Sequence, residues 1–420
     1  NFMTDKSKNN GSVITDKGGK IDWFIFGSAA LILFSLTILL ASHPESSAAI
    51  INKFYIFVTS TVGVLYILAG TLVLSFLIWL SLSKYGTVVF GEEVQPEYSE
   101  FSWCSMLFCA GIGASLLYWS ATEWVFYYTS PPFGITSRSD EAINWAVSYG
   151  IFHWGPVGWA FYCLPAIALG CSFHINKNPT LRLSAACEPV LKSSARRWPG
   201  RVIDLLFLLG VIATSATGLG FGTSVVSSAI AELTSIREGL ELQIAIIAAA
   251  TLIICISVYR GLDRGILVFS NANSILALVF ITFVLVVGPT VFILEMGVTV
   301  LGVVTSEFIT MLLWTDPLQK SNFVESWTIF YWAWWLAMGP FVGMFICKIS
   351  KGRTIRQVAL GMLFYGSAGC SLFFIVLGNY ALHAELSGLY SVVDNAIQSS
   401  PSAAIAGLVK LLPAGSFWLF

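Results

Sequence analysis

The stretch WTIFYWAWW at residues 327–335 is the most informative part of the sequence, and it continues through GPFVG at 339–343. On a helix, four of its rings share one face, at i, i+4, i+7 and i+8: Trp327, Tyr331, Trp334 and Trp335. Most Trp and Tyr residues of membrane helices form belts at the interface. These rings lie instead from the first third to the middle of an apolar span over 322–348. The stretch therefore leaves two interpretations open, an aromatic-lined site or an interfacial belt.

The composition places the chain among polytopic helical membrane proteins. Of its 420 residues, 56% are hydrophobic and 11% are charged, which excludes a soluble globule of ordinary make-up. The net charge of −1 gives no sign of nucleic-acid binding. The eight Cys residues lie in apolar spans or in loops predicted to be cytosolic, so no disulfide framework is expected. Residues 1–20 are polar, and we expect a flexible cytoplasmic tail there rather than a signal peptide.

About ten apolar segments are long enough to cross a bilayer. They are 21–42, 54–83, 102–128, 143–173, 202–233, 242–258, 265–294, 322–348, 355–384 and a last one from about 403. Most Lys and Arg residues fall in the N-terminal tail and in the loops on its side, which predicts a cytoplasmic N-terminus. The segment 297–320 is expected to lie on the outer surface, because a crossing there would move the basic loop after Trp335 outside.

The third and fourth spans also carry unusual residues. The third contains CAGIGAS at 109–115, which indicates either close helix packing or a locally unwound helix whose backbone faces a substrate or an ion. Glu123 in the same span is expected to mark a polar partner or a pathway. In the fourth span, Trp154, Trp159 and Tyr162 share a broad face near mid-membrane. His153 is expected to be a buried, hydrogen-bonded histidine, because no second ligand is spaced to complete a metal site.

The order of these spans predicts an internal repeat. The third span runs from inside to outside and the eighth, five spans later, runs from outside to inside, so the two are predicted to begin an inverted five-helix repeat with the site at its interface. The predicted divisions are the tail 1–20, two peripheral helices with a loop in 21–101, the first repeat in 102–296, the outer helix in 297–320 and the start of the second repeat in 321–420. No ATPase, metalloprotease or serine hydrolase motif occurs, and no enzymatic activity is expected.

These residues resemble the betaine/choline/carnitine transporter family, from about the second span to the end of the chain. The most specific parts are the 327–353 stretch, the 152–162 run and the 111–113 stretch with Glu123. The resemblance implies a twelve-helix transporter of the LeuT-like fold, with about ten helices in this chain. It further implies a homotrimer in the inner (plasma) membrane that moves trimethylammonium or sulfonium zwitterions. No cofactor and no nucleic-acid partner are expected.

The resemblance also implies a binding site. A trimethylammonium group has no N–H to donate, and aromatic faces replace its hydration. The implied box consists of Trp154, Trp159, Tyr162, Trp334 and Trp335. Two further rings, Trp327 and Tyr331, are implied to line the path that leads to the box from the outer side. Phe126 or Tyr127 is a candidate for a further ring. The substrate carboxylate is expected at the backbone of Gly111, Gly113 and Ser115.

Three positions bear on ion coupling in this family. Ser115 stands where proton-coupled members tend to carry Asp, and Asn273 and Val342 stand where sodium-independent carnitine exchangers carry Arg and Met. Sodium symport is therefore expected, with Val211 in place of a sodium-binding Thr weakening one ion site. The candidate sodium contacts are Ala110, Ile112, Ser215 and Phe341.

Other functions stay open at this point. A sodium-independent exchanger of carnitine or betaine is the main alternative, because residues 127–134 resemble that branch. A cation channel is less favoured, since it should show a continuous polar pore, and a non-transporting sensor would need an output domain. The substrate is open among glycine betaine, choline, carnitine, ectoine and dimethylsulfoniopropionate.

Overall fold

A computed structural model of the chain describes residues 22–92, 95–111, 115–178, 180–234, 236–260, 265–318, 320–415 and 418. Within these ranges the structure is helical, with one isolated β-bridge between Val89 and Thr354. Nine described helical stretches are long and apolar enough to cross a membrane. A tenth crossing is counted if α4 (Glu100–Gly111) and α5 (Ser115–Thr129), which are bent by 61° to one another, form one span. The predicted all-helical, polytopic fold class is confirmed.

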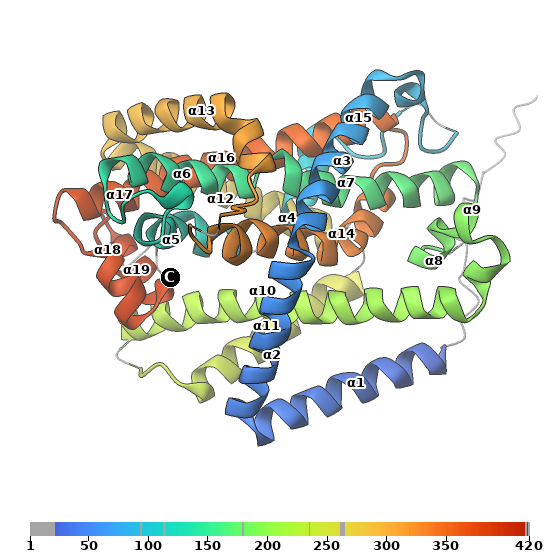
Figure 1. Cartoon of the computed structure of the whole chain (residues 1–420), viewed down its shortest axis with the longest axis horizontal. Coiled ribbons are helices and arrows are strands. Elements are labelled where there is room, and N and C mark those ends of the chain that lie inside the picture. The colour runs from blue at the N-terminus through green and yellow to red at the C-terminus, as the bar shows by residue number, and fades with distance from the viewer. Residues whose placement is uncertain are drawn as a thin grey trace, which may run out of the picture.

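One long helix runs along the length of the molecule (Figure 1). α10 (Trp198–Thr234) runs along the molecule and contacts α14 (Ile329–Ile349), while α14 packs along α7 (Pro156–Gly170). The other elements are α1 (Trp23–Ser42), α2 (Pro44–Thr61), α3 (Gly63–Leu82), α6 (Asp140–His153), α8 (Leu183–Ala186), α9 (Glu188–Leu191), α11 (Leu240–Arg260), α12 (Leu267–Val287), α13 (Thr290–Leu313), α15 (Ile355–Gly361), α16 (Ser367–Phe373), α17 (Asn379–Leu386), α18 (Val392–Asp394) and α19 (Pro401–Lys410). Single π-helical turns precede α14, at Val324–Thr328, and flank α16, at Met362–Gly366 and Phe374–Gly378.

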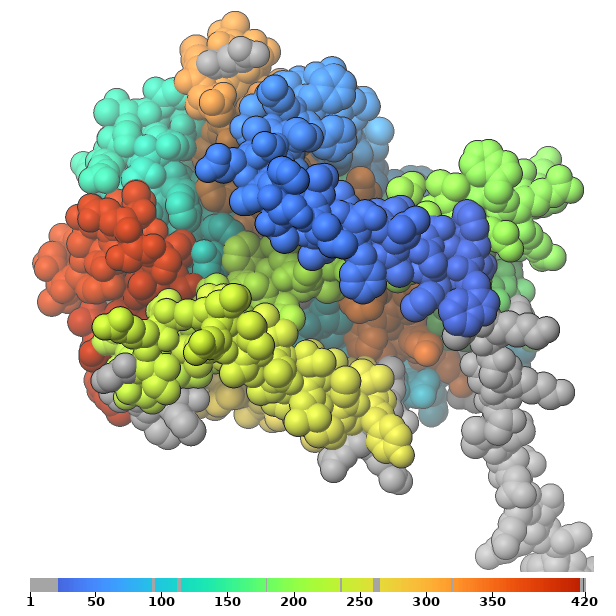
Figure 2. All heavy atoms as spheres, turned by 90° about the horizontal axis from the view of Figure 1, so that it is seen from below, coloured from blue at the N-terminus to red at the C-terminus, as the bar shows by residue number. Residues whose placement is uncertain are grey.

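The outer helices expose the apolar surface expected of a membrane protein. On the face shown in Figure 2, α1 and α2 (blue) and α11 (yellow) form two ridges, with α10 visible between them. Large apolar side chains on these helices face outward, among them Leu206, Leu252 and Phe34. In water such a surface would be unfavourable, so lipid is its natural solvent.

Two predicted spans have different boundaries in the structure. The predicted span 54–83 is divided, because α2 ends at Thr61 and α3 begins at Gly63. A Cβ atom on Gly63 would lie 2.4 Å from Cδ1 of Ile329, so the glycine permits a close approach at this break. Where a tenth span was expected from about residue 403, the structure has α19, which ends at Lys410. The tenth span stays a prediction.

The region after α12 also differs from the prediction. The seventh span was expected to reach residue 294, but α12 ends at Val287 and α13 begins at Thr290, after a break at Gly288 and Pro289. Proline has no backbone N–H, which favours a helix start there. α13 packs on α6 and is itself long enough to cross a membrane. Its location on the outer surface stays a prediction.

Glycines bring α7 and α14 into backbone contact. A Cβ atom on Gly339 would lie 2.7 Å from the carbonyl oxygen of Phe161, and one on Gly343 would lie 2.7 Å from the backbone nitrogen of Ala166. Such close approach is characteristic of small residues between membrane helices. The contact fixes the aromatic residues of α14 beside those of α7.

The loop before α4 is joined to the loop after α14. The backbone N–H of Phe90 donates to the carbonyl of Arg353 at 2.9 Å, and the N–H of Gly352 donates to the carbonyl of Phe90 at 2.8 Å. The Arg353 side chain is 3% exposed and binds Glu100 at 2.7 Å. The start of α4 is therefore attached to the end of α14.

Candidate functional site

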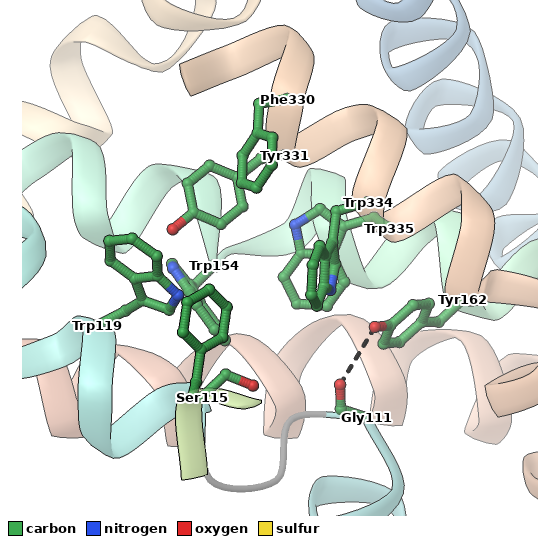
Figure 3. Close-up of a pocket in the computed structure, with 10 residues that line it drawn as sticks. Gly111, Ser115, Trp119, Trp154, Tyr162, Phe330, Tyr331, Trp334 and Trp335 are labelled. Atoms are coloured by element: carbon green, nitrogen blue, oxygen red, sulfur yellow. Dashed lines mark hydrogen bonds between the residues drawn. The ribbon is translucent and has the colours of Figure 1, made fainter. Parts of the chain in front are cut away.

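A small cavity lies where α4, α5, α7, α10 and α14 meet (Figure 3). Its volume is about 20 Å³, which is room for about one water molecule. Eight of its ten lining residues are aromatic, and the full lining is Gly111, Ser115, Trp119, Trp154, Tyr162, Phe221, Phe330, Tyr331, Trp334 and Trp335. The cavity is thus a box of π-faces at the junction between α4 and α5.

The rings of the box support one another by edge-to-face contacts. The Trp335 ring lies 4.7 Å from Tyr162 and 5.6 Å from Trp154, with interplanar angles of 63° and 85°. Trp154 in turn lies 5.8 Å from Tyr331 at 64°. These are the separations and tilts that aromatic pairs prefer. The wall is therefore held by packing between its own members.

A break between α6 and α7 positions Trp154. Trp154 is the C-cap of α6, and Gly155 adopts an extended conformation before Pro156 starts α7. A Cβ atom on Gly155 would lie 2.7 Å from the carbonyl oxygen of Ile151, so a larger residue would clash with the last turn of α6. Gly155 and Pro156 thus turn the chain at the cavity.

Trp335 reaches the cavity because α7 presents a glycine to it. A Cβ atom on Gly158 would lie 2.6 Å from Cε2 of Trp335 and 2.8 Å from its Nε1. The indole Nε1–H donates to the backbone carbonyl of His153 at 3.1 Å. Trp335 is therefore fixed in both position and orientation.

The end of α4 forms the floor of the box. The Tyr162 hydroxyl donates to the carbonyl of Gly111 at 3.2 Å (Figure 3). Ser115 begins α5, so the positive end of that helix dipole lies at the cavity. The predicted contacts Ile112 and Gly113 lie outside the described residues.

A buried carboxylate stands behind two of the rings. Glu123 is fully buried and accepts three hydrogen bonds, from the hydroxyls of Tyr127 and Tyr331, each at 2.5 Å, and from Nε1 of Trp154 at 2.9 Å. The Tyr127 hydroxyl is also 2.9 Å from Nδ1 of His153. The polar partner expected for Glu123 is thus a set of aromatic donors, two of which line the cavity.

The imidazole of His153 continues this network. Its Nε2 lies 3.0 Å from Oγ1 of Thr328, and the side chain is fully buried. Both ring nitrogens therefore have partners, and the prediction of a hydrogen-bonded buried histidine is confirmed. Among the described residues, no group of three or more His, Cys, Asp and Glu side chains is arranged to hold a metal ion.

The structure brings most of the predicted substrate-binding residues together, but not all. Those that line the cavity are Trp154, Tyr162, Trp334, Trp335, Tyr331, Gly111 and Ser115. Trp159 lies behind the wall, buried against Gly111, Tyr162 and Trp335. Trp327 lies next to the lining, stacked on Tyr331 at 6.5 Å and edge-to-face with Trp119 at 5.9 Å. Tyr127 and Phe126, the candidate further rings, contact Trp327 rather than the cavity.

Three lining residues were not predicted as site residues. Trp119 lies one turn after Ser115 on α5, and Phe330 lies one turn before Trp334 on α14, so helical spacing from a predicted residue would have found both. Phe221 on α10 is flanked by Gly220 and Gly222, which is only a weak signal. Its ring lies 5.4 Å from Trp119 and 6.5 Å from Trp334, so it closes the box between α5 and α14.

Sequence comparison identifies the family. A family model described as BCCT, betaine/carnitine/choline family transporter, matches residues 24–420. The chain belongs to the betaine/carnitine/choline transporter family. The predicted resemblance is confirmed, and the protein is a transporter rather than an enzyme. It is accordingly a multi-span membrane protein.

Relatives in the betaine/carnitine/choline family have several named substrates. A carnitine transporter of Acinetobacter baumannii is 33% identical over 418 residues, covering 99% of this chain and 75% of the relative. A high-affinity choline transport protein of Escherichia coli K12 is 36% identical over 402 residues, covering 95% of this chain and 59% of the relative. An ectoine/hydroxyectoine transporter of Virgibacillus pantothenticus is 33% identical over 391 residues, covering 93% of this chain and 77% of the relative.

Three of the candidate sodium contacts, Ala110, Ser215 and Phe341, are not among the residues that line the cavity. Ser215 is exposed on α10, and Phe341 on α14 is 40% exposed. Ala110 is half-buried at the end of α4. Their role in binding sodium stays a prediction.

Proposed function

We propose that this family member transports a small onium compound, a molecule with a fully alkylated nitrogen or sulfur cation, and binds it in the aromatic box. The observation that carries the proposal is the lining of the cavity, where Trp154, Trp334 and Trp335 converge at the broken helix. The family and the relatives named for carnitine and choline support it.

The chemistry of the box suits such a cation. Each aromatic face attracts a cation by about 0.5–2 kcal/mol, depending on how far the site is desolvated. The cavity is small, about 20 Å³, so we expect the rings to separate when a ligand enters. Binding is therefore coupled to a conformational change, as alternating access requires.

An anionic end of the ligand has a place as well. Ser115 starts α5, and the N-terminus of a helix favours negative charge. A zwitterion with a carboxylate one or a few bonds from the cation would meet rings at one end and a helix N-terminus at the other. This favours a betaine-like substrate over a simple cation.

A competition experiment tests the proposal. One radiolabelled onium ligand is bound to the full-length transporter in proteoliposomes and displaced by glycine betaine, choline, carnitine, ectoine or dimethylsulfoniopropionate. We expect at least one onium zwitterion to bind and to be taken up into the vesicles. If no onium compound is bound or transported while another solute is, the proposed substrate class is wrong.

We further propose sodium symport. Ser115 offers no carboxylate for proton coupling, Asn273 gives no fixed cation, and Val342 lacks a thioether. Uptake should therefore depend on an imposed sodium gradient and not on substrate inside the liposome. Equal rates with sodium and potassium outside, together with stimulation by preloaded substrate, would establish the alternative, an exchanger of carnitine or betaine.

We also propose that the transporter is a homotrimer. The proposal rests on the family resemblance alone. Light scattering of the purified protein in detergent measures its mass directly. A monomeric mass after gentle extraction would contradict the proposal.

A further inference from the structure

The Glu123 carboxylate has no obvious use in a site built from aromatic faces. It is 0% exposed and lies in the helix that also carries the lining residues Ser115 and Trp119. Among the described ion pairs its one basic neighbour is His153, whose Nδ1 is 4.0 Å from Oε1. A buried carboxylate is expensive inside a membrane span and by default has a function. Its hydrogen bonds show where that function lies.

All three groups that bind Glu123 point a donor at it. The indole N–H of Trp154 has no acceptor capacity, so it must donate to the carboxylate at 2.9 Å. The hydroxyls of Tyr127 and Tyr331 also donate to the carboxylate, at 2.5 Å each. Three donated bonds are the arrangement that stabilises the charged form of a buried carboxyl group.

Two of these donors belong to rings that line the box. Trp154 and Tyr331 contact one another at 5.8 Å, and each has its polar atom on Glu123 and its ring on the cavity. A cation–π interaction is electrostatic, so it strengthens when the ring is richer in electrons. Donation of the indole N–H or the phenol O–H to a carboxylate moves electron density toward the ring. In a site of low dielectric constant, the carboxylate charge also acts on the cation directly.

We propose that Glu123 is the fixed negative charge of the site and acts on a bound cation through Trp154 and Tyr331. The inference rests on the proposed function, since it requires an onium ligand in the box. Glu123 touches the two rings and not the cavity, so it is a positioning residue that also carries charge. Recognition of the cation would then depend on a group that the ligand does not touch.

The competing explanation is purely structural. Glu123 joins α5 to α14 through Tyr331, so its removal could simply let the rings move. A loss of ring position would weaken every ligand that fills the box. A loss of charge would weaken only ligands that carry a cation. A ligand pair that differs only in this charge therefore separates the two explanations.

Glycine betaine and 3,3-dimethylbutanoate form such a pair, because a tert-butyl group replaces the trimethylammonium group at nearly the same size. Choline and 3,3-dimethylbutanol form a second pair. Affinities for both members of a pair are measured with the full-length transporter, for wild type and for Glu123→Gln. We expect the variant to bind the onium compound at least about tenfold more weakly and the carbon analogue within about twofold of wild type.

Thr328→Val is the matched control. It removes a buried hydroxyl from the same network, at Nε2 of His153, but leaves the carboxylate in place. Both ligands should bind this variant within about twofold of wild type, because the charge on Glu123 is unchanged. An equal loss of both ligands in Glu123→Gln, or no loss of either, would overturn the inference.

If Glu123→Gln does not fold, a second variant tests whether Glu123 acts on the bound cation. Tyr331→Phe keeps the ring in the cavity and removes one donor to Glu123. We expect its affinity for the onium compound to fall about threefold with the carbon analogue unaffected. Wild-type affinity for both ligands would overturn the inference. If the wild-type protein binds no onium compound, the proposed function fails and this inference fails with it.

Discussion

The guanidinium group of Arg353 lies over the ring of Trp103, with Cζ 4.3 Å from the ring centroid. Trp103 belongs to α4, and Arg353 follows α14, so the contact joins the first helices of the two predicted repeats. Nη1 of Arg353 also binds Glu100 at 2.7 Å, and Nη2 donates to the carbonyl of Tyr98 at 3.2 Å. One side chain thus connects the loop and helix on one side with the end of α14 on the other.

Arg353→Lys should weaken this connection. A lysine ammonium cannot stack on Trp103 and bind Glu100 and the Tyr98 carbonyl at the same time, because it lacks the planar fork of donors. We expect a loss of about 1–2 kcal/mol, seen as a lower midpoint of thermal unfolding in detergent. Lys351→Arg, at an exposed position in the same loop, is the control. Equal midpoints for Arg353→Lys and wild type would contradict the prediction.

Removing a π-face from the box should weaken onium binding. Trp334→Leu keeps apolar volume and removes the ring, so the affinity should fall by at least about 1 kcal/mol, or about fivefold. Trp154→Leu should behave likewise. Trp79→Leu on α3, where the side chain is 54% exposed, is the control and should bind normally. Wild-type affinity in both box variants, measured by radioligand displacement, would refute the aromatic box.

Gly158→Ala should displace Trp335 from the cavity. The added methyl group would lie 2.6 Å from the indole, closer than a real Cβ contact permits. We expect onium affinity to fall about tenfold. Trp335 contacts the rings of Tyr162 and Trp154, so its displacement should shift these two rings as well. In Gly302→Ala on α13 the new methyl group meets nothing within 4 Å, so binding should not change. Unchanged affinity in Gly158→Ala would show that the ring position is not decisive.

The predicted orientation can be tested by labelling. Cysteines placed at Arg197 and Lys351, both exposed, should resist an impermeant maleimide in intact cells, because the positive-inside rule puts both loops in the cytoplasm. The background must lack the native thiols, of which Cys255 is exposed. A cysteine at exposed Ser387, predicted to be outside, should react. Labelling of the first two from outside would reverse the topology.

Local patterns predicted the parts of the site that local geometry determines. Helical spacing put Tyr331, Trp334 and Trp335 on one face, and all three line the cavity. The same spacing argument selected Trp327, which does not line the cavity. It lies one turn before Tyr331, in the π-helical segment that precedes α14. Periodicity gives the face of a helix, while depth along the bundle depends on the neighbouring helices.

Tertiary contacts explain the remaining differences. Trp159 shares a face of α7 with the lining residues, but the close approach of Gly111 and Gly366 places its ring behind the wall. Phe221 comes from a helix that carries no aromatic run, so its own segment gave only the weak signal of the two flanking glycines. The divided second span likewise depends on Ile329, more than 250 residues away in the sequence.

The backbone contact of α7 with α14 at Gly339 and Gly343 has a mechanical consequence. Two helices that touch along their main chains cannot slide past each other without breaking that fit. Trp335 and Tyr162 therefore belong to one stiff unit, while the lining residues Trp119 and Phe221 come from α5 and α10. We therefore expect any movement that widens the cavity to leave the contact between α7 and α14 intact.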